Sequence, residues 1–141
     1  MVCFICLERG EVMPISLDYV NSNEGVILRY SGVTTGRQML KSYRDIYNNQ
    51  EYPQLKYIIS DRTNSDSYDV EPHHISRLAQ MTKDIFPVNP DVCYAIVSKK
   101  ALEFGMARMY QLLTEEFGFK VVHFEEMAEA QNWVAEQIRT D

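Results

Sequence analysis

Hydrophobic and polar positions follow two patterns that alternate along the chain. Tyr57–Ile59 and Val92–Val97 are continuous apolar or aromatic runs, typical of strands buried on both faces of a parallel sheet. Positions 15–20 instead alternate between apolar and polar residues, which predicts a half-exposed edge strand. The turn-forming residues 21–25 separate this strand from a second one at Val26–Tyr30, so we expect the chain to open with an antiparallel hairpin.

Between these runs, apolar residues recur at helical spacing in four stretches. Thr34 is a plausible N-cap for the first helix, and Pro72 suits the first turn of the second. The predicted apolar stripes, in chain order, are Met39, Leu40, Tyr43, Ile46 and Tyr47; Ile75, Leu78, Ala79, Thr82, Ile85 and Phe86; Leu102, Met106, Met109, Leu113 and Phe117; and Ala130, Trp133, Val134 and Ile138.

From about Val26 onward, strands and helices alternate four times. This order predicts an α/β fold with a mostly parallel sheet, an N-terminal antiparallel strand or hairpin, and about four helices. A length of 141 residues fits one domain spanning 1–141, with 1–14 as an extra strand or a tail.

Composition and charge narrow the classes of function. The net charge of −6 and the absence of basic clusters argue against nucleic-acid binding, which needs Lys and Arg to neutralise phosphates. No apolar run approaches the roughly 20 residues of a membrane span. Three cysteines fit a reducing compartment, so we expect a cytoplasmic protein.

No sequence fingerprint of a cofactor or metal site is complete. Gly-x-Gly-x-x-Gly and P-loop motifs are absent, so no cofactor is expected. Cys3 and Cys6 form a Cys-x-x-Cys motif without a second ligand pair, and we expect neither zinc binding nor a required disulfide there. His73 and His74 follow Pro72, but adjacent helical residues point about 100° apart, which argues against a shared ion.

The strongest candidate for a binding or regulatory site is the polar stretch that follows the strand at Tyr57. Ligands of open α/β sheets bind outside the carboxyl ends of strands, where helix N-termini point. This stretch is predicted to be an exposed loop, with candidate residues Asp61, Arg62, Thr63, Ser65 and Ser67.

A second group lies after the strand at Val92–Val97. Ser98, Lys99 and Arg108 are candidates for a rim that receives a carboxylate or phosphate. The alternative is an ordinary solvated rim, since charged residues are mostly exposed.

The chain resembles the SpoIIAA-like proteins of the STAS and SEC14-like group. The resemblance rests on Tyr94–Val97, Phe104–Tyr110, Val121–Phe124 and Glu129–Val134, and it extends over about Val26–Val134. It implies a sheet with helices packed mainly on one face. The anti-anti-sigma members bind protein partners and are switched by phosphorylation of a Ser or Thr after the central strand, which here maps to the stretch holding Thr63, Ser65 and Ser67. The family's Asp-Ser-Ser-Gly-type run is replaced by Asp61-Arg62-Thr63-Asn64, without a glycine.

These observations lead to a non-enzymatic STAS-like regulatory or protein-interaction domain as the expected function. The alternative is a carrier of a small apolar ligand or lipid, which the SEC14-like side of the group implies. An enzyme is a third class, although no Ser, Cys or Lys has a base of the triad kind visible in the sequence. The expected partner is therefore a protein or a small apolar molecule, and a homodimer is compatible with the sequence.

Overall fold

The fold is built on a single five-stranded sheet. The computed structural model describes residues 14–139, with Tyr68 described by its backbone alone. In chain order the elements are β1 (Ile15–Val20), β2 (Gly25–Thr35), α2 (Gly36–Tyr47), the 3-10 turn η1 (Tyr52–Gln54), β3 (Tyr57–Asp69), α3 (Pro72–Ile85), the 3-10 turn η2 (Phe86–Val88), β4 (Cys93–Val97), α4 (Ala101–Glu115), β5 (Lys120–Phe124) and α5 (Met127–Arg139).

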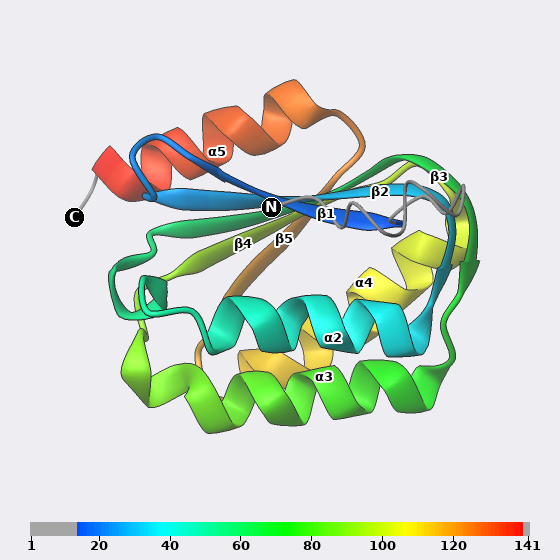
Figure 1. The fold of residues 1–141 in the computed structure, drawn as a ribbon, viewed down its shortest axis with the longest axis horizontal. Coiled ribbons are helices and arrows are strands. Elements are labelled where there is room, and N and C mark those ends of the chain that lie inside the picture. Colours follow the sequence, from blue (N-terminus) through cyan, green and yellow to red (C-terminus); the bar gives the residue numbers. More distant parts are fainter. Residues whose placement is uncertain (1–13, 140–141) are drawn as a thin grey trace, which may run out of the picture.

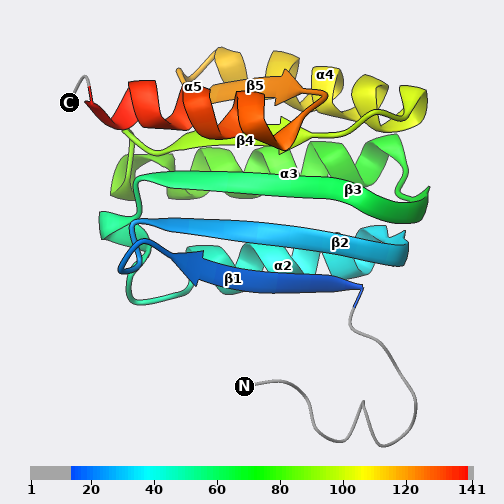
Figure 2. The ribbon, with the colours of Figure 1, turned by 90° about the horizontal axis from the view of Figure 1, so that it is seen from above.

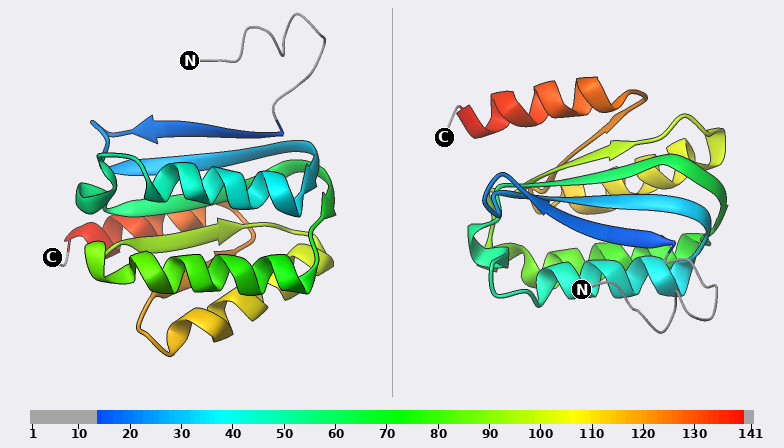
Figure 3. Two further views of the ribbon diagram at one scale, coloured as in Figure 1. Left: turned by 60° about the horizontal axis from the view of Figure 1, so that its bottom comes forward. Right: turned by 45° about the horizontal axis from the view of Figure 1, so that its top comes forward.

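The strands lie in the order β1-β2-β3-β4-β5, with β3 in the centre. β1 is antiparallel to β2, and every other neighbouring pair is parallel. Helices α2, α3 and α4 cover one face, and α5 lies alone on the other (Figure 1). The two further views agree on these three layers (Figure 3). The predicted fold class and the interior position of the Tyr57 strand are thus confirmed.

Aromatic side chains dominate the core between the sheet and α2–α4. The Tyr94 ring projects from β4, with its centroid 5.8 Å from that of Tyr43 and 5.6 Å from that of Tyr110. The Thr82 hydroxyl lies 2.9 Å from the Tyr47 hydroxyl and 2.7 Å from that of Tyr110, so these buried groups satisfy one another. Burial raises the pKa of Tyr47 to about 12, which keeps its phenol neutral.

The prediction of an exposed loop after Tyr57–Ser60 is wrong, because β3 continues as a strand to Asp69. Its partner β2 also runs past the predicted end at Tyr30, as far as Thr35. The N-cap of α2 is therefore Thr35 rather than Thr34, and its side chain forms a capping box with Gln38.

The predicted apolar stripe of α4 is wrong at Leu102 and Leu113, whereas Met106, Met109 and Phe117 are partly buried against the core. Leu102 is 56% exposed and Leu113 is 38% exposed. The side of α4 that is buried consists instead of Glu103, Ala107, Tyr110 and Thr114. Small and hydrogen-bonded side chains face inward here, so hydrophobicity does not mark the buried face of this helix.

On the other face, Trp133 packs α5 against the sheet, as predicted. Its ring centroid lies 5.8 Å from that of Phe124 in β5, although the Trp133 side chain is only partly buried. The predictions for Cys3, Cys6 and the stretch 1–13 lie outside the described residues.

Candidate functional site

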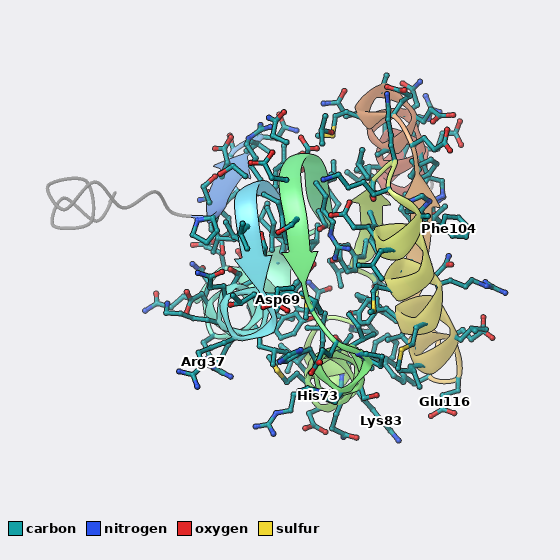
Figure 4. The ribbon with its side chains drawn as sticks, turned by 90° about the vertical axis from the view of Figure 1, so that its right-hand side faces the viewer. Arg37, Asp69, His73, Lys83, Phe104 and Glu116 are labelled. Atoms are coloured by element: carbon teal, nitrogen blue, oxygen red, sulfur yellow. The ribbon has the colours of Figure 1, made fainter. Side chains whose placement is uncertain are left out.

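The most distinctive feature of the molecule is a two-stranded ribbon at the carboxyl end of the sheet. β3 pairs with β4 only as far as Asp61, which lies opposite Val97. Beyond that point β3 pairs with β2 alone, through residues 31–35 of β2 and 64–69 of β3. The extension of β3 ends at Asp69, between the starts of α2 and α3 (Figure 4). We call residues 31–35 and 64–69 the ribbon.

Two cationic side chains hold this region in place. Arg62 is 4% exposed, and its guanidinium carbon lies 5.0 Å from the centroid of the Tyr30 ring, a cation–π distance. The Lys100 ammonium, at the start of α4, donates hydrogen bonds to the backbone carbonyls of Ser65 and Asp66, the latter at 2.8 Å. The ribbon is thus tied both to the sheet and to α4.

Asp61 fixes the bend where β3 leaves β4. Its Oδ1 accepts hydrogen bonds from the Thr63 backbone N–H at 3.1 Å and from the Thr63 hydroxyl at 2.6 Å. Its Oδ2 lies 3.7 Å from the guanidinium of Arg29. These contacts stabilise the backbone of residues 61–63, where the pairing register between β2 and β3 shifts.

The hydroxyl groups predicted as candidates differ in accessibility. Thr63 and Ser67 are exposed, whereas Ser65 is 3% exposed. The Ser65 hydroxyl points to the carbonyl of Ser67 at 3.5 Å. Of the three, Ser67 therefore combines exposure with a hydroxyl that is not engaged by Asp61.

The second predicted group does not form one rim. Ser98 is 1% exposed, and its hydroxyl donates to Glu103 at 2.6 Å. Lys99 forms a 2.8 Å ion pair with Glu126, and this contact raises the pKa of the Lys99 ammonium. Arg108 is exposed about two turns along α4. The three residues thus have separate surroundings.

A buried polar cluster, which the sequence did not reveal, lies near the carboxyl ends of β4 and β5. Glu103 projects from the first turn of α4 and is 1% exposed, and the Ser98 hydroxyl reaches it from the end of β4. The register places His123 of β5 beside Ile96, two residues before Ser98. Within residues 14–139, the buried atoms without a hydrogen-bond partner include Tyr30 Oη, Ser60 Oγ, Glu103 Oε2 and His123 Nε2. Proteins keep few such groups, because each is costly.

His123 is the member of this cluster whose side chain type changes its charge near physiological pH. Burial is the largest effect on the His123 pKa and lowers it, and the charge of Arg62 lowers it further. A backbone hydrogen bond with Ser98 and the charges of Glu125 and Glu103 raise the pKa. The net shift is downward from the ordinary value of 6.5. The unfolded chain therefore binds this proton at a higher pH than the folded chain does.

We expect the His123 contribution to stability to be complete above about pH 6.5 and to be lost as the pH falls from there through the folded pKa. Urea unfolding at pH values on both sides of this window measures it. The His123→Gln variant should lose less stability on acidification than the wild type. Equal acid sensitivity of His123→Gln and the wild type would contradict this account.

The two adjacent histidines lie closer together than the sequence argument predicted. The ring centroids of His73 and His74 are 4.0 Å apart, and both rings group with the carboxylate of Glu71. His74 Nδ1 accepts the Glu71 backbone N–H at 3.0 Å, which caps α3. The positive end of the α3 dipole disfavours a cation here, so we interpret this group as a helix cap.

In the part of the chain that the structure describes, no helix has the length and apolar character needed to cross a membrane.

Comparisons with known proteins support the fold. No protein-family model matches the chain. No curated protein matches it either. Among solved structures, the unphosphorylated form of the anti-sigma factor antagonist SpoIIAA is similar with a TM-score of 0.56 and 13% identity, over 86% of this chain and 97% of SpoIIAA. An uncharacterised DUF3478 protein with a SpoIIAA-like fold from Shewanella loihica PV-4 is similar with a TM-score of 0.53 and 15% identity, over 85% of this chain and 91% of that one. The chain thus has a SpoIIAA-like, STAS-type fold.

Proposed function

We propose that this chain is a non-enzymatic regulatory domain of the cytoplasm that binds a protein partner through the outer side of the ribbon. The observation that carries this proposal is the extension of β2 and β3 beyond the rest of the sheet. An extended, exposed ribbon gives a partner both side chains and a strand edge to contact. A role in protein interaction also agrees with the similarity in fold to an anti-sigma factor antagonist.

The ribbon combines a fixed backbone with exposed side chains. The buried Arg62 and the exposed Lys100 hold it in place, while Asn64, Asp66 and Ser67 are exposed. Val33 is 57% exposed on the neighbouring strand. Apolar anchors surrounded by polar groups are common in protein interfaces, and a surface that is already ordered loses less entropy on binding.

We expect the Val33→Asp variant to bind the partner about ten-fold more weakly than the wild type, because it replaces an exposed apolar anchor with a charge. The partner is first identified by affinity capture and mass spectrometry, and its Kd is then measured by calorimetry. Val88→Asp is the matched control, since Val88 is 49% exposed but lies in η2. Equal weakening in both variants, or none in Val33→Asp, would contradict the proposal.

Of the three candidate hydroxyls Thr63, Ser65 and Ser67, we propose Ser67 as the regulatory, phosphorylated position. It is exposed and lies opposite Val33 in the ribbon. A phosphate would add about −1.5 to −2 charge at this docking surface. At Thr63 the same charge would face the Asp61 carboxylate, and Ser65 is too buried for a kinase to reach.

We expect Ser67→Glu to change the partner Kd by about ten-fold while leaving the melting temperature close to that of the wild type, as for a charge at an interface rim. Thr63→Glu should instead lower the free energy of unfolding by about 1 kcal/mol, because it removes the hydrogen bond to Asp61 and adds a like charge. Calorimetry and thermal melts test both variants. An unchanged Kd for Ser67→Glu would remove the support for a switch at this residue.

A second candidate function, the binding of a small apolar ligand, is favoured by a separate observation. A groove of about 380 Å³ lies between α5 and the sheet, on the opposite face from α2, α3 and α4. We propose this groove, rather than the ribbon, as the place where such a ligand binds.

A further inference from the structure

The groove exists because α5 covers only part of its face of the sheet. Seen from above, α5 lies over β4 and β5 and leaves β1 and β2 uncovered (Figure 2). The groove lies along the inner edge of α5, and its volume of about 380 Å³ falls within the range of small-molecule pockets, about 300–1,000 Å³. It is lined by residues from the β1–β2 hairpin, from β3 and from α5, namely Val20, Asn21, Ile27, Tyr57, Ile59, Gln131, Val134, Ala135 and Ile138.

Most of the residues that line the groove are apolar, and the few polar ones indicate which class of ligand fits. Ile27, Ile59 and Val134 supply aliphatic surface from three different elements. The polar groups are the side-chain amides of Asn21 and Gln131 and the phenol of Tyr57. A long apolar surface with a few polar groups is the usual composition of a site for a mainly apolar molecule.

The polar groups can offer hydrogen-bond donors to a ligand. Asn21 Nδ2 donates to the Tyr57 hydroxyl oxygen at 2.7 Å, which leaves the phenol's own hydrogen available for an acceptor. Burial raises the pKa of Tyr57, the hydrogen bond from Asn21 lowers it, and the charge of Glu24 raises it. The phenol is therefore a neutral donor. None of the residues that line the groove is charged, so a ligand anion would find no cationic partner there.

The donors are held in position before a ligand arrives. Asn21, Ser22 and Asn23 have φ angles of 54°, 58° and 68°, so three consecutive non-glycine residues adopt the left-handed conformation. Such a backbone costs free energy and persists only where its surroundings enforce it. Gly25 closes the hairpin against the Tyr57 ring, and a Cβ at this glycine would lie 2.0 Å from a ring carbon. Gly25 is thus required for the ring to occupy this place.

From this geometry we infer that the groove binds a neutral, mainly aliphatic molecule carrying one hydrogen-bond acceptor, such as an ester or ketone, with the acceptor on the Tyr57 hydroxyl. The inference rests on the second candidate function and specifies the ligand class. The acceptor meets Tyr57, and the aliphatic part lies between Ile59 and the α5 side chains Val134 and Ala135.

Three probes of equal chain length differ in the property that is tested. Methyl octanoate carries a neutral hydrogen-bond acceptor, octane carries none, and octanoate carries a negative charge. Each is titrated against the protein loaded with the neutral dye Nile red, and dye release is followed by fluorescence. We expect methyl octanoate to bind at least about ten-fold more tightly than octanoate. Tyr57→Phe should weaken methyl octanoate about five-fold, as for the loss of one neutral hydrogen bond, and leave octane unchanged.

Two matched variants locate the site. Ala135→Phe places a ring in the groove and should abolish dye binding, whereas Ala128→Phe, at an exposed α5 position outside the groove, should leave it unchanged. Two results would overturn the ligand class while leaving an apolar site in place. One is octanoate binding as tightly as the ester, and the other is an equal loss of affinity for octane and the ester in Tyr57→Phe. Absence of dye binding would overturn both, as would self-association that Ala135→Phe abolishes, since a second copy would then occupy the groove.

Discussion

The Tyr94→Ala variant is expected to lose about 3–5 kcal/mol of unfolding free energy, the usual cost of truncating a fully buried aromatic side chain. Tyr94 is 1% exposed, and its ring contacts the rings of Tyr43, Tyr110 and Phe119. Truncation would thus open a cavity where α2, α4 and the sheet meet. For a domain of this size, the melting temperature should fall by roughly 10–20 °C.

Chemical unfolding of the variant and the wild type measures this loss. Tyr19→Ala is the control, because Tyr19 is only partly buried on the edge strand β1 and should cost much less. A similar loss in both variants would show that Tyr94 is not at the centre of the core.

The Glu103→Ala variant is expected to lose roughly 2–4 kcal/mol, although it replaces a charged residue in a helix with the best helix former. Glu103 is 1% exposed and accepts a hydrogen bond from Ser98 at 2.6 Å. Removing its carboxylate leaves the buried Ser98 hydroxyl without this acceptor and takes a negative charge from the surroundings of Arg62 and His123.

A readout at His123 separates this electrostatic role from simple loss of packing. The Glu103 carboxylate raises the His123 pKa, so an NMR titration of Glu103→Ala should show a lower His123 pKa than in the wild type. Glu115→Ala, at an exposed position of the same helix, should change neither quantity. An unchanged His123 pKa in Glu103→Ala would contradict the electrostatic account of the cluster.

The sheet and its order of elements were predictable because a strand that is buried on both faces appears in the sequence as an uninterrupted apolar run. Tyr57–Ile59 and Cys93–Val97 contact side chains on both sides, so no position in these runs is polar. Four helices follow from apolar spacing in the same way. In α4, however, exposed Leu102, Phe104 and Leu112 add hydrophobic residues to the solvent side, and the true buried face contains a glutamate.

The ribbon could not be predicted from the residues that form it. Residues 61–69 are almost entirely polar, with no β-branched alternation of the kind that marks a strand. They are held as a strand by pairing with β2 and by Lys100, which is more than thirty positions away in the chain. Tertiary contacts override local propensity here. The buried cluster was not predicted for the same reason, since His123 joins Ser98 and Glu103 only through the pairing of β5 with β4.

Hydrogen–deuterium exchange of the protein alone and in complex with its captured partner tests whether the partner binds to the ribbon. We expect added protection on binding to be concentrated in the ribbon, at residues 31–35 and 64–69. The α5 face, with its separate groove, should exchange as in the free protein. Protection confined to α5 or to other surfaces, with the ribbon unchanged, would show that the partner docks elsewhere and would contradict the proposed function.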